Sequence, residues 1–249
     1  MEDLSFYVGV IGNVISVLMF LAPVGTFRRI IKHKSTEDFQ SLPYICTLLS
    51  SSLWTYYGIT KPGGYLIATV NGFGILVEAI YVTLFLIYSP TTTIRGKTAA
   101  LFGILDVGFL SAAILVTRFA LEGEARIDAI GFLCAGLNII MYASPLSAMK
   151  TVVTTKSVEY MPFLLSFFFF WNDGTWAFYA LLVRDVFLGV PNGTGFLLGT
   201  AQLVLYAIYK SAKPSKSKNV LNALEEGTQR EPLIMISPRL RDAEQSKGD

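Results

Sequence analysis

The stretch WTYY at residues 54–57 recurs as WAFY at residues 176–179, and this recurrence decides the fold. Three other pairs of stretches match: AP at 22–23 with SP at 144–145, KSTE at 34–37 with KSVE at 156–159, and NGFG at 71–74 with NGTG at 192–195. The offset is 122 residues for the first three of these four pairs and 121 for the last. Matches that keep one register indicate an internal duplication.

The composition places this duplication in a membrane. Of 249 residues, 53% are hydrophobic and only 15% are charged, and the mean hydropathy is +0.53. Soluble domains carry about 25% charged residues, so an ordinary water-soluble globule is not expected. The net charge of +2 is too small to indicate a nucleic-acid-binding protein. Two cysteines and ten prolines exclude a disulfide scaffold and a collagen-like chain.

Seven apolar stretches approach the ~20 residues that a helix needs to cross a bilayer. They are residues 6–27, 42–59, 65–87, 98–117, 127–148, 163–182 and 186–209. The repeat offset covers four spans, an even number, so both copies enter the membrane in the same direction. We therefore predict an all-α membrane protein, with two parallel three-helix bundles (1–90 and 121–212) joined by a linker helix (91–120) in a 3+1+3 order. Residues 213–249 are expected to form a disordered cytosolic tail.

Basic residues set the orientation, because cytosolic loops carry an excess of them. With the N-terminus outside or lumenal, the cytosolic loops and the start of the C-terminal tail hold twelve Lys and Arg residues, and the loops of the other side hold four. The twelve are Arg28, Arg29, Lys32, Lys34, Arg95, Lys97, Lys150, Lys156, Lys210, Lys213, Lys216 and Lys218. The four are Lys61, Arg118, Arg126 and Arg184. The sequence thus predicts a lumenal or extracellular N-terminus and a cytosolic C-terminus.

Neutral polar and aromatic side chains recur at matching depths in the two copies. Trp54 and Trp176 are expected near the middle of the membrane, where two indole faces could enclose a sugar ring. Asn71 and Asn192 offer amide donors and acceptors that suit hydroxyl groups. Because a polar side chain in lipid is costly unless it has a partner or faces a cavity, these pairs indicate a central binding site. The alternative is that they only pack helices together.

Two further pairs are expected to surround the same space. Ser50 and Asn172 lie four residues before the tryptophans and share their helix face. Met19 and Met141 lie on the first and fifth spans, where their bulky, pliable side chains would narrow the site.

Four prolines lie toward the cytosolic ends of the spans. Pro23 and Pro145 are near the ends of the first and fifth spans, and Pro43 and Pro162 start the second and sixth. Since proline removes an i→i−4 hydrogen bond and permits a kink, we expect Pro23 and Pro145 to act as hinges of a gate. An ordinary helix-start role stays open for Pro43 and Pro162.

Acidic residues within the spans are Glu78, Asp106 and Asp173, and only Asp173 is expected near the site. None has a carboxylate at the matching position of the other copy, which does not favour a proton relay. Asp173 is expected to be protonated, hydrogen-bonded or wetted by the cavity. The single histidine, His33, is expected in a solvated loop and completes no catalytic triad. With no phosphate loop or metal-ligand pattern, we predict no enzyme, cofactor or metal.

At this point the sequence resembles the plant SWEET family of sugar transporters over nearly all of residues 6–213. The shared motifs are PxxTF at 23–27, STE at 35–37, LPY at 42–44, WxxYG at 54–58, NG at 71–72, SPL at 144–146, KSVExMP at 156–162 and PNG at 191–193. The resemblance implies facilitated, uncoupled transport of mono- or disaccharides by alternating access. Residues 51–57 and 138–142 are most similar to the vacuolar subgroup, which implies hexoses such as fructose or glucose and the vacuolar membrane, with the plasma membrane as the alternative.

The resemblance also implies roles for individual residues. The sugar-contacting set would be Trp54, Trp176, Asn71 and Asn192. The size-selecting positions would be Met19, Ser50, Met141 and Asn172. The proline tetrad of the gate would be Pro23, Pro43, Pro145 and Pro162, and Tyr57 with Asp185 would form part of the extracytosolic gate. Asp173 departs from the pattern, because the family usually has a small residue there.

Two other functions stay open at this stage. A proton-coupled sugar carrier would use Glu78 or Asp173, and a seven-helix receptor would share the topology without needing the duplication. The expected partners are a mono- or disaccharide, the lipid bilayer and possible further copies of the chain, with no nucleic acid.

Overall fold

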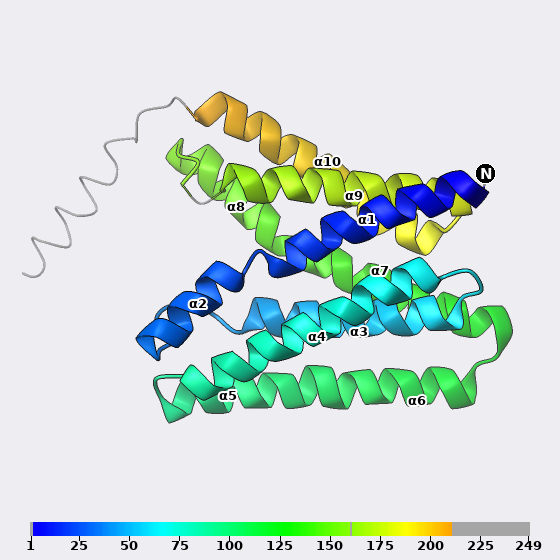
Figure 1. The fold of residues 1–249 in the computed structure, drawn as a ribbon, viewed down its shortest axis with the longest axis horizontal. Coiled ribbons are helices and arrows are strands. Elements are labelled where there is room, and N and C mark those ends of the chain that lie inside the picture. Colours follow the sequence, from blue (N-terminus) through cyan, green and yellow to red (C-terminus); the bar gives the residue numbers. More distant parts are fainter. Residues whose placement is uncertain (1, 160, 211–249) are drawn as a thin grey trace, which may run out of the picture.

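The computed structural model describes residues 2–159 and 161–210, so the tail expected at 213–249 lies outside the described residues. The described chain is all-helical and forms seven rods that run along the long axis of the molecule (Figure 1). The rods are α1 (Glu2–Leu21) with α2 (Val24–His33), α3 (Leu42–Thr60), α4 (Tyr65–Tyr88), α5 (Thr92–Phe102) with the π-helical segment η1 (Gly103–Phe109) and α6 (Leu110–Ala120), α7 (Gly123–Met141) with α8 (Ala143–Thr155), α9 (Phe163–Val183) and α10 (Val186–Tyr209). This arrangement confirms the predicted fold class.

The two sets of three rods meet through their first helices. Helix α1 packs against α4 of its own set and against α9 of the other, and α7 packs against both α10 and α3. In Figure 1, α8, α9 and α10 lie with α1 on one side, α2 to α6 lie on the other, and α7 crosses between them. The linker rod packs on α3, α4 and α7, so it flanks the interface between the sets.

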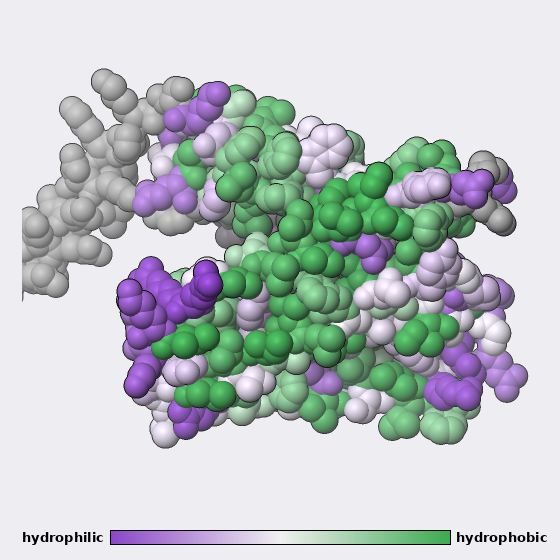
Figure 2. Space-filling model, viewed as in Figure 1, coloured by the Kyte–Doolittle hydropathy of each residue, from purple (hydrophilic) through white to green (hydrophobic). Residues whose placement is uncertain are grey.

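Apolar side chains cover the outside of this helical assembly. Figure 2 shows hydrophobic residues over most of the middle of one face and hydrophilic residues gathered at both ends of the long axis. Phe119, Ile140 and Leu181 are each more than 70% exposed, which is costly in water and favourable in lipid. Four stretches are long and apolar enough to cross a membrane by length and composition alone: Asp3–His33, Tyr65–Tyr88, Thr92–Ala120 and Gly123–Thr155.

The first and fifth rods are both interrupted near the same end of the molecule. The first breaks at Pro23, which caps α2 and has no N–H to continue the ladder of α1. The fifth breaks at Tyr142, three residues before Pro145, which lies in the first turn of α8. We call this the proline end of the molecule. Both short helices then terminate in a left-handed lysine, Lys34 (φ 52°) and Lys156 (φ 56°), so the duplication extends to the backbone.

The other two predicted gate prolines stand at helix starts. Pro43 is the second residue of α3, and Pro162 immediately precedes α9. A proline at these positions leaves no intrahelical hydrogen bond unmade, because the first N–H groups of a helix have no partner in any case. The positions of Pro43 and Pro162 therefore agree with an ordinary helix-start role.

Candidate functional site

A cavity of about 380 Å³ lies between the two sets of helices. Its lining includes all eight residues predicted to contact or select a substrate, namely Met19, Ser50, Trp54, Asn71, Met141, Asn172, Trp176 and Asn192. The volume lies within the range of about 300–1,000 Å³ that is usual for small-molecule sites. The folded chain therefore brings together residues that span more than 170 positions of sequence.

In the first half of the cavity, the side chains of α3 are hydrogen-bonded to α7. Trp54 Nε1 donates to Asn138 Oδ1 at 3.4 Å, and Ser50 Oγ donates to the same oxygen at 3.1 Å. Trp54 also meets the ring of Tyr57 edge-on, with 5.4 Å between centroids. The two hydrogen bonds join the second rod of one repeat to the first rod of the other.

In the second half, the equivalent side chains of α9 are hydrogen-bonded to α1. Trp176 Nε1 donates to Ser16 Oγ at 3.0 Å, and Ser16 Oγ donates to Asn172 Oδ1 at 2.7 Å. Trp176 meets Tyr179 edge-on at the same centroid distance of 5.4 Å as its counterpart. Asn172 Nδ2 in turn donates to Asp173 Oδ1 at 3.2 Å. The second half thus extends the chain of hydrogen bonds by one carboxyl group.

The two asparagines of the third and seventh rods present the same atoms to the cavity. Asn71 Nδ2 donates to the carbonyl of Ile67 at 2.9 Å, and Asn192 Nδ2 donates to that of Leu188 at 2.8 Å. Each amide therefore binds its own helix through one N–H and keeps its carbonyl oxygen as an acceptor. This arrangement suits a ligand that donates hydrogen bonds from hydroxyl groups.

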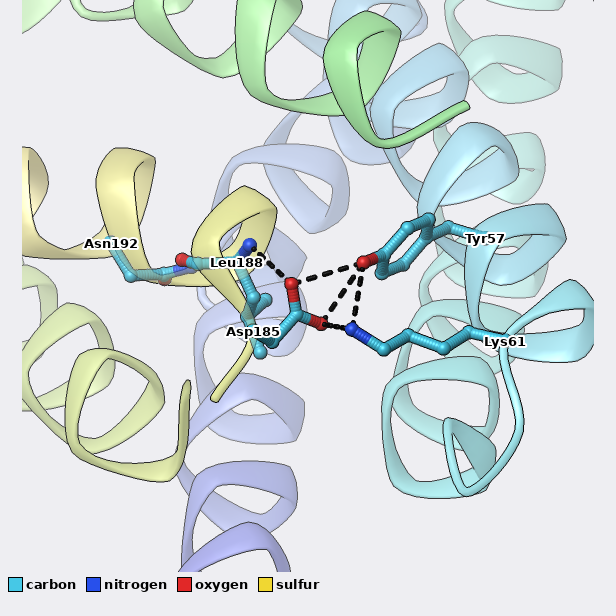
Figure 3. Close-up of polar contacts among 5 residues, drawn as sticks. All are labelled: Tyr57, Lys61, Asp185, Leu188 and Asn192. Atoms are coloured by element: carbon cyan, nitrogen blue, oxygen red, sulfur yellow. Dashed lines mark hydrogen bonds and ion pairs between the residues drawn. The ribbon is translucent and has the colours of Figure 1, made fainter. Parts of the chain in front are cut away.

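A cluster of charged and polar groups joins the two repeats one turn beyond Trp54 on α3 (Figure 3). Tyr57 Oη donates to both oxygens of Asp185, at 3.0 and 3.1 Å, and Lys61 Nζ lies 2.6 Å from Asp185 Oδ2 and 3.0 Å from Tyr57 Oη. Asp185 Oδ1 also accepts from the N–H of Leu188 at the start of α10. The cluster links α3 to α10 across the two repeats. We call it the Asp185 end, and the predicted pair of Tyr57 and Asp185 does meet there.

The opposite end of the cavity is reached by two of the four predicted gate prolines. Pro23, Pro43 and Tyr44 line it, whereas Pro145 and Pro162 are absent from the lining that the structure describes. The cavity therefore extends from the tryptophans toward the proline end, and Tyr57, Lys61 and Asp185 are not among the residues that line it in the described chain.

The structure corrects one expectation about the acidic residues. Asp173 was expected to be the only carboxyl group near the site, but Glu78 on α4 also lines the cavity and is 3% exposed. The prediction was wrong because Glu78 lies seven residues beyond Asn71, which is two helical turns and so on the same face of α4.

Three residues of the site were missed in the sequence. Ser16 and Asn138 hold the two indoles, and they are separated by the same 122 residues as the tryptophans, so the repeat register would have found them. Lys61 lies four residues after Tyr57 on the same helix face, and that spacing predicts contact with whatever Tyr57 binds.

At the proline end, outside the spans, a histidine contacts a carboxylate. His33 is half exposed, which agrees with the solvated position expected for it, and its Nδ1 lies 2.6 Å from Glu37 Oε1. Arg29 forms an ion pair with the same carboxylate, and the hydrogen bonds from Arg29 and then His33 lower the pKa of Glu37 below its usual value. In the second repeat Thr151 and Thr155 stand at the positions of Arg29 and His33.

Within the described residues no cluster of three or more His, Cys, Asp or Glu side chains could hold a metal ion. The two cysteines, Cys46 and Cys134, are both free thiols. Apart from Glu78 and Asp173, the polar side chains that line the cavity in the described chain are uncharged.

Comparison with known proteins places this geometry in a family. Residues 6–93 and residues 128–214 each match the family model described as a sugar efflux transporter for intercellular exchange. The two matched segments correspond to the two repeats, and the linker rod lies between them.

Individual relatives and a solved structure agree with this match. The chain is 63% identical over 241 residues to the bidirectional sugar transporter SWEET17 of Arabidopsis thaliana, covering 96% of this chain and 100% of the relative. It is 60% identical over 216 residues to SWEET16 of the same plant, covering 86% and 93%. A solved structure of a eukaryotic SWEET transporter superposes with a TM-score of 0.79 at 39% identity, covering 83% of this chain and 97% of that one.

Proposed function

The chain belongs to the family of sugar efflux transporters for intercellular exchange, and from that premise we propose that it is a uniporter of hexoses, fructose or glucose, that works by alternating access. Membership makes it a sugar transporter and not an enzyme. The proposal adds the substrate size, the absence of coupling and the mechanism. It also assigns the eight lining residues to sugar binding and the Asp185 cluster to one of two gates.

The observation that carries the proposal is the cavity between the repeats, whose polar lining is mostly uncharged. Two indoles and four amides surround it, and the asparagines keep carbonyl acceptors for sugar hydroxyl groups. Met19 and Met141 occupy matching places on its wall, where their volume favours a monosaccharide over a disaccharide. Polar contacts that join the repeats at the Asp185 end, with a cavity that reaches the proline end, are what one of the two states of an alternating-access carrier requires.

We also propose that the protein lies in the vacuolar membrane with its N-terminus in the lumen. The identity of 63% to SWEET17 and 60% to SWEET16 supports the vacuolar subgroup that the sequence motifs indicate, and the basic residues favour a lumenal N-terminus and a cytosolic C-terminus. In that orientation the proline end faces the cytosol and the Asp185 end faces the vacuolar lumen.

Proton-coupled sugar transport is the second candidate, because two carboxyl groups line the cavity. Glu78 and Asp173 are 3% and 5% exposed, and neither forms an ion pair in the described part of the chain. We favour uniport because the two groups lie on different helices at unmatched positions of the repeat.

The test is sugar flux into liposomes that contain only the purified full-length chain. We expect radiolabelled fructose or glucose to equilibrate in either direction along its gradient, faster than in protein-free liposomes, with sucrose excluded. Flux of sucrose at a similar rate would overturn the hexose assignment. Flux no faster than in protein-free liposomes would overturn the proposed function.

A further inference from the structure

Asp173 is a buried carboxyl group at the cavity with no counterpart in the other repeat. It is 5% exposed, lines the cavity from α9, and lies beside Asn172. The equivalent position of the first repeat is Ser51, which is 122 residues earlier. The second half of the cavity therefore contains a hydrogen-bonding group that the duplication alone does not explain.

A glycine provides the space for this carboxyl group. Asp173 Oδ2 and Tyr142 Oη both lie so close to Gly195 that a Cβ at that position would collide with them. The equivalent glycine of the first repeat, Gly74, faces Ser51 Oγ, which lies 2.8 Å from where a Cβ would be. Each repeat thus seats a polar side chain against the last glycine of its NGxG motif, and the second repeat seats a larger one.

The direction of the hydrogen-bond chain is dictated by its two ends. The indole of Trp176 can only donate, so Ser16 Oγ must accept from it and give its own proton to Asn172 Oδ1. Asn172 Nδ2 then faces Asp173, whose Oδ1 accepts from it at 3.2 Å. The hydrogen-bond chain therefore ends at position 173 on a side chain that accepts a hydrogen bond.

The other carboxyl oxygen indicates the protonation state. Tyr142 donates its hydroxyl proton to the carbonyl of Pro191 at 2.7 Å, so only its lone pairs remain for Asp173 Oδ2. Oδ2 is buried and has no hydrogen-bond partner within residues 2–159 and 161–210. The groups around it are Tyr142, Gly195 and, through Asn172, Ser16, and none of these carries a positive charge. In a neutral carboxyl group, the proton on Asp173 Oδ2 points toward the lone pairs of Tyr142 Oη. No two lone pairs then face each other.

We propose that Asp173, as a neutral carboxyl group, is a positioning residue that fixes the Asn172 amide as a hydrogen-bond donor to the sugar. This rests on the proposed function, because Asn172 is taken as part of the sugar site. With its oxygen held by Ser16 and one N–H held by Asp173, Asn172 keeps a single N–H for a sugar oxygen. The first half offers a different set, since Ser50 and Trp54 share one oxygen of Asn138 and leave that amide's nitrogen unused by them. The two halves of a duplicated site are thereby made unequal, as an asymmetric sugar requires.

The first test compares three variants by hexose uptake in proteoliposomes. We expect Asp173→Gly to raise the KM about threefold to tenfold with Vmax unchanged, the size of losing one oriented hydrogen bond. Asp173→Asn keeps an acceptor at Oδ1 and places an N–H where the carboxyl proton lies, so its KM should stay near that of the original chain. Thr175→Gly, in the same helix but outside the cavity lining, controls for weakening α9 by a glycine. An unchanged KM in Asp173→Gly, or an equal rise in Asp173→Asn, would overturn the proposal.

The second test asks whether Asp173 acts through Asn172. In the Asn172→Ala background, adding Asp173→Gly should raise the KM no further, whereas additive effects would show an independent, merely structural role. If Asp173→Gly fails to insert, Gly195→Ala serves instead, because its new methyl group displaces the carboxyl, and the same non-additivity is required. Absence of flux in the unaltered chain would instead overturn the proposed function, so the two failures are distinguishable.

Discussion

Each tryptophan of the cavity is held through its indole N–H and through contacts to its ring. The indoles of Trp54 and Trp176 donate to Asn138 and Ser16 of the opposite repeat, and each forms a T-shaped contact with one tyrosine. A buried indole N–H without a partner would cost about 1–3 kcal/mol, so these bonds also hold the two repeats together. Gly12 lies against the indole of Trp176, and both tryptophans line the cavity.

Replacing either indole therefore removes a wall of the site. We expect Trp54→Ala and Trp176→Ala each to lower initial hexose uptake by about tenfold or more, as for a buried aromatic at the centre of a binding surface. Uptake at matched protein content in liposomes measures this. The control is Trp171→Ala, since Trp171 lies on α9 but is half exposed on the outside of the molecule. Equal uptake by all three variants would contradict the pocket assignment.

The methionines determine the width of the same space. Met19 and Met141 line the cavity at equivalent positions, so Met19→Val together with Met141→Val removes volume from both sides. We expect the double variant to transport sucrose as well as hexoses, with the single variants in between. Competition of unlabelled sucrose against labelled fructose gives the readout. Continued exclusion of sucrose by the double variant would show that other residues set the size limit.

The Asp185 cluster depends on one cation. Lys61 Nζ lies 2.6 Å from a carboxylate whose side chain is 1% exposed, and truncating one partner of a buried pair is more costly than losing an exposed one. We expect Lys61→Met to open this end more often. In a chain with Cys46→Ser, Cys134→Ser and Leu188→Cys, an impermeant thiol reagent applied from the Asp185 side should then label residue 188 several-fold faster. An unchanged labelling rate would mean that Tyr57 and Leu188 hold Asp185 without help.

At the scale of the elements, the two broken rods differ although their sequences are duplicated. In the first, α1 ends just before Pro23, and in the second, α7 ends at Met141, one turn ahead of Pro145. A proline cannot donate to the carbonyl four residues before it, which is that of Met19 in one rod and of Met141 in the other. The Met19 carbonyl accepts instead from the N–H of Ala22 at 3.1 Å, in the turn that ends α1. Both methionines line the cavity, so bending at these points would move its wall.

Restoring the missing hydrogen bond should stiffen the first rod. We expect Pro23→Ala to lower Vmax severalfold while the KM for hexose changes little, because Pro23 lines only the proline end of the cavity and is not among the eight residues assigned to sugar binding. The comparison variant is Pro62→Ala, which alters a proline in the turn between α3 and α4 away from the cavity. A rise in KM without loss of Vmax would place Pro23 in sugar binding instead of in the moving part.

At the scale of the whole molecule, the duplication explains what could be predicted from the sequence. Residues that recur at offset 122, such as Trp54 with Trp176, were predicted to meet, and the folded chain brings them to one cavity. What lay outside the repeated motifs was harder. Glu78 reaches the cavity only because two turns of α4 return it to the face of Asn71, and Lys61 joins the cluster only because Asp185 is already there.

Where the two repeats have different residues, the sequence alone did not predict which contacts those residues make. Ser51 and Asp173 occupy equivalent positions, yet only the second extends a hydrogen-bond chain, since that depends on Ser16 facing Asn172 across the repeats. Such contacts between helices distant in sequence become visible only when α1 is seen to pack on α9. The fold could be predicted from one repeat, but the specificity of the site depends on how the repeats meet.

The coupling of transport is a property of the whole molecule, because a coupled carrier must link a proton to every turnover. In a uniporter neither Glu78 nor Asp173 gains or loses a proton during the transport cycle. Collapsing a pH gradient with a protonophore should therefore leave the initial rate of hexose uptake within about 20% of its value, which is the scatter of such assays. In a coupled carrier, each 1.4 kcal/mol of lost driving force would change the accumulation ratio about tenfold. Uptake into liposomes with a pH-sensitive dye inside measures both fluxes at once. Sugar-dependent acidification of the interior, abolished by Glu78→Gln or Asp173→Asn, would identify a proton-coupled carrier. Since Asp173→Asn is expected to leave the KM unchanged, the same variant separates a carboxyl that only positions Asn172 from one that carries a proton across.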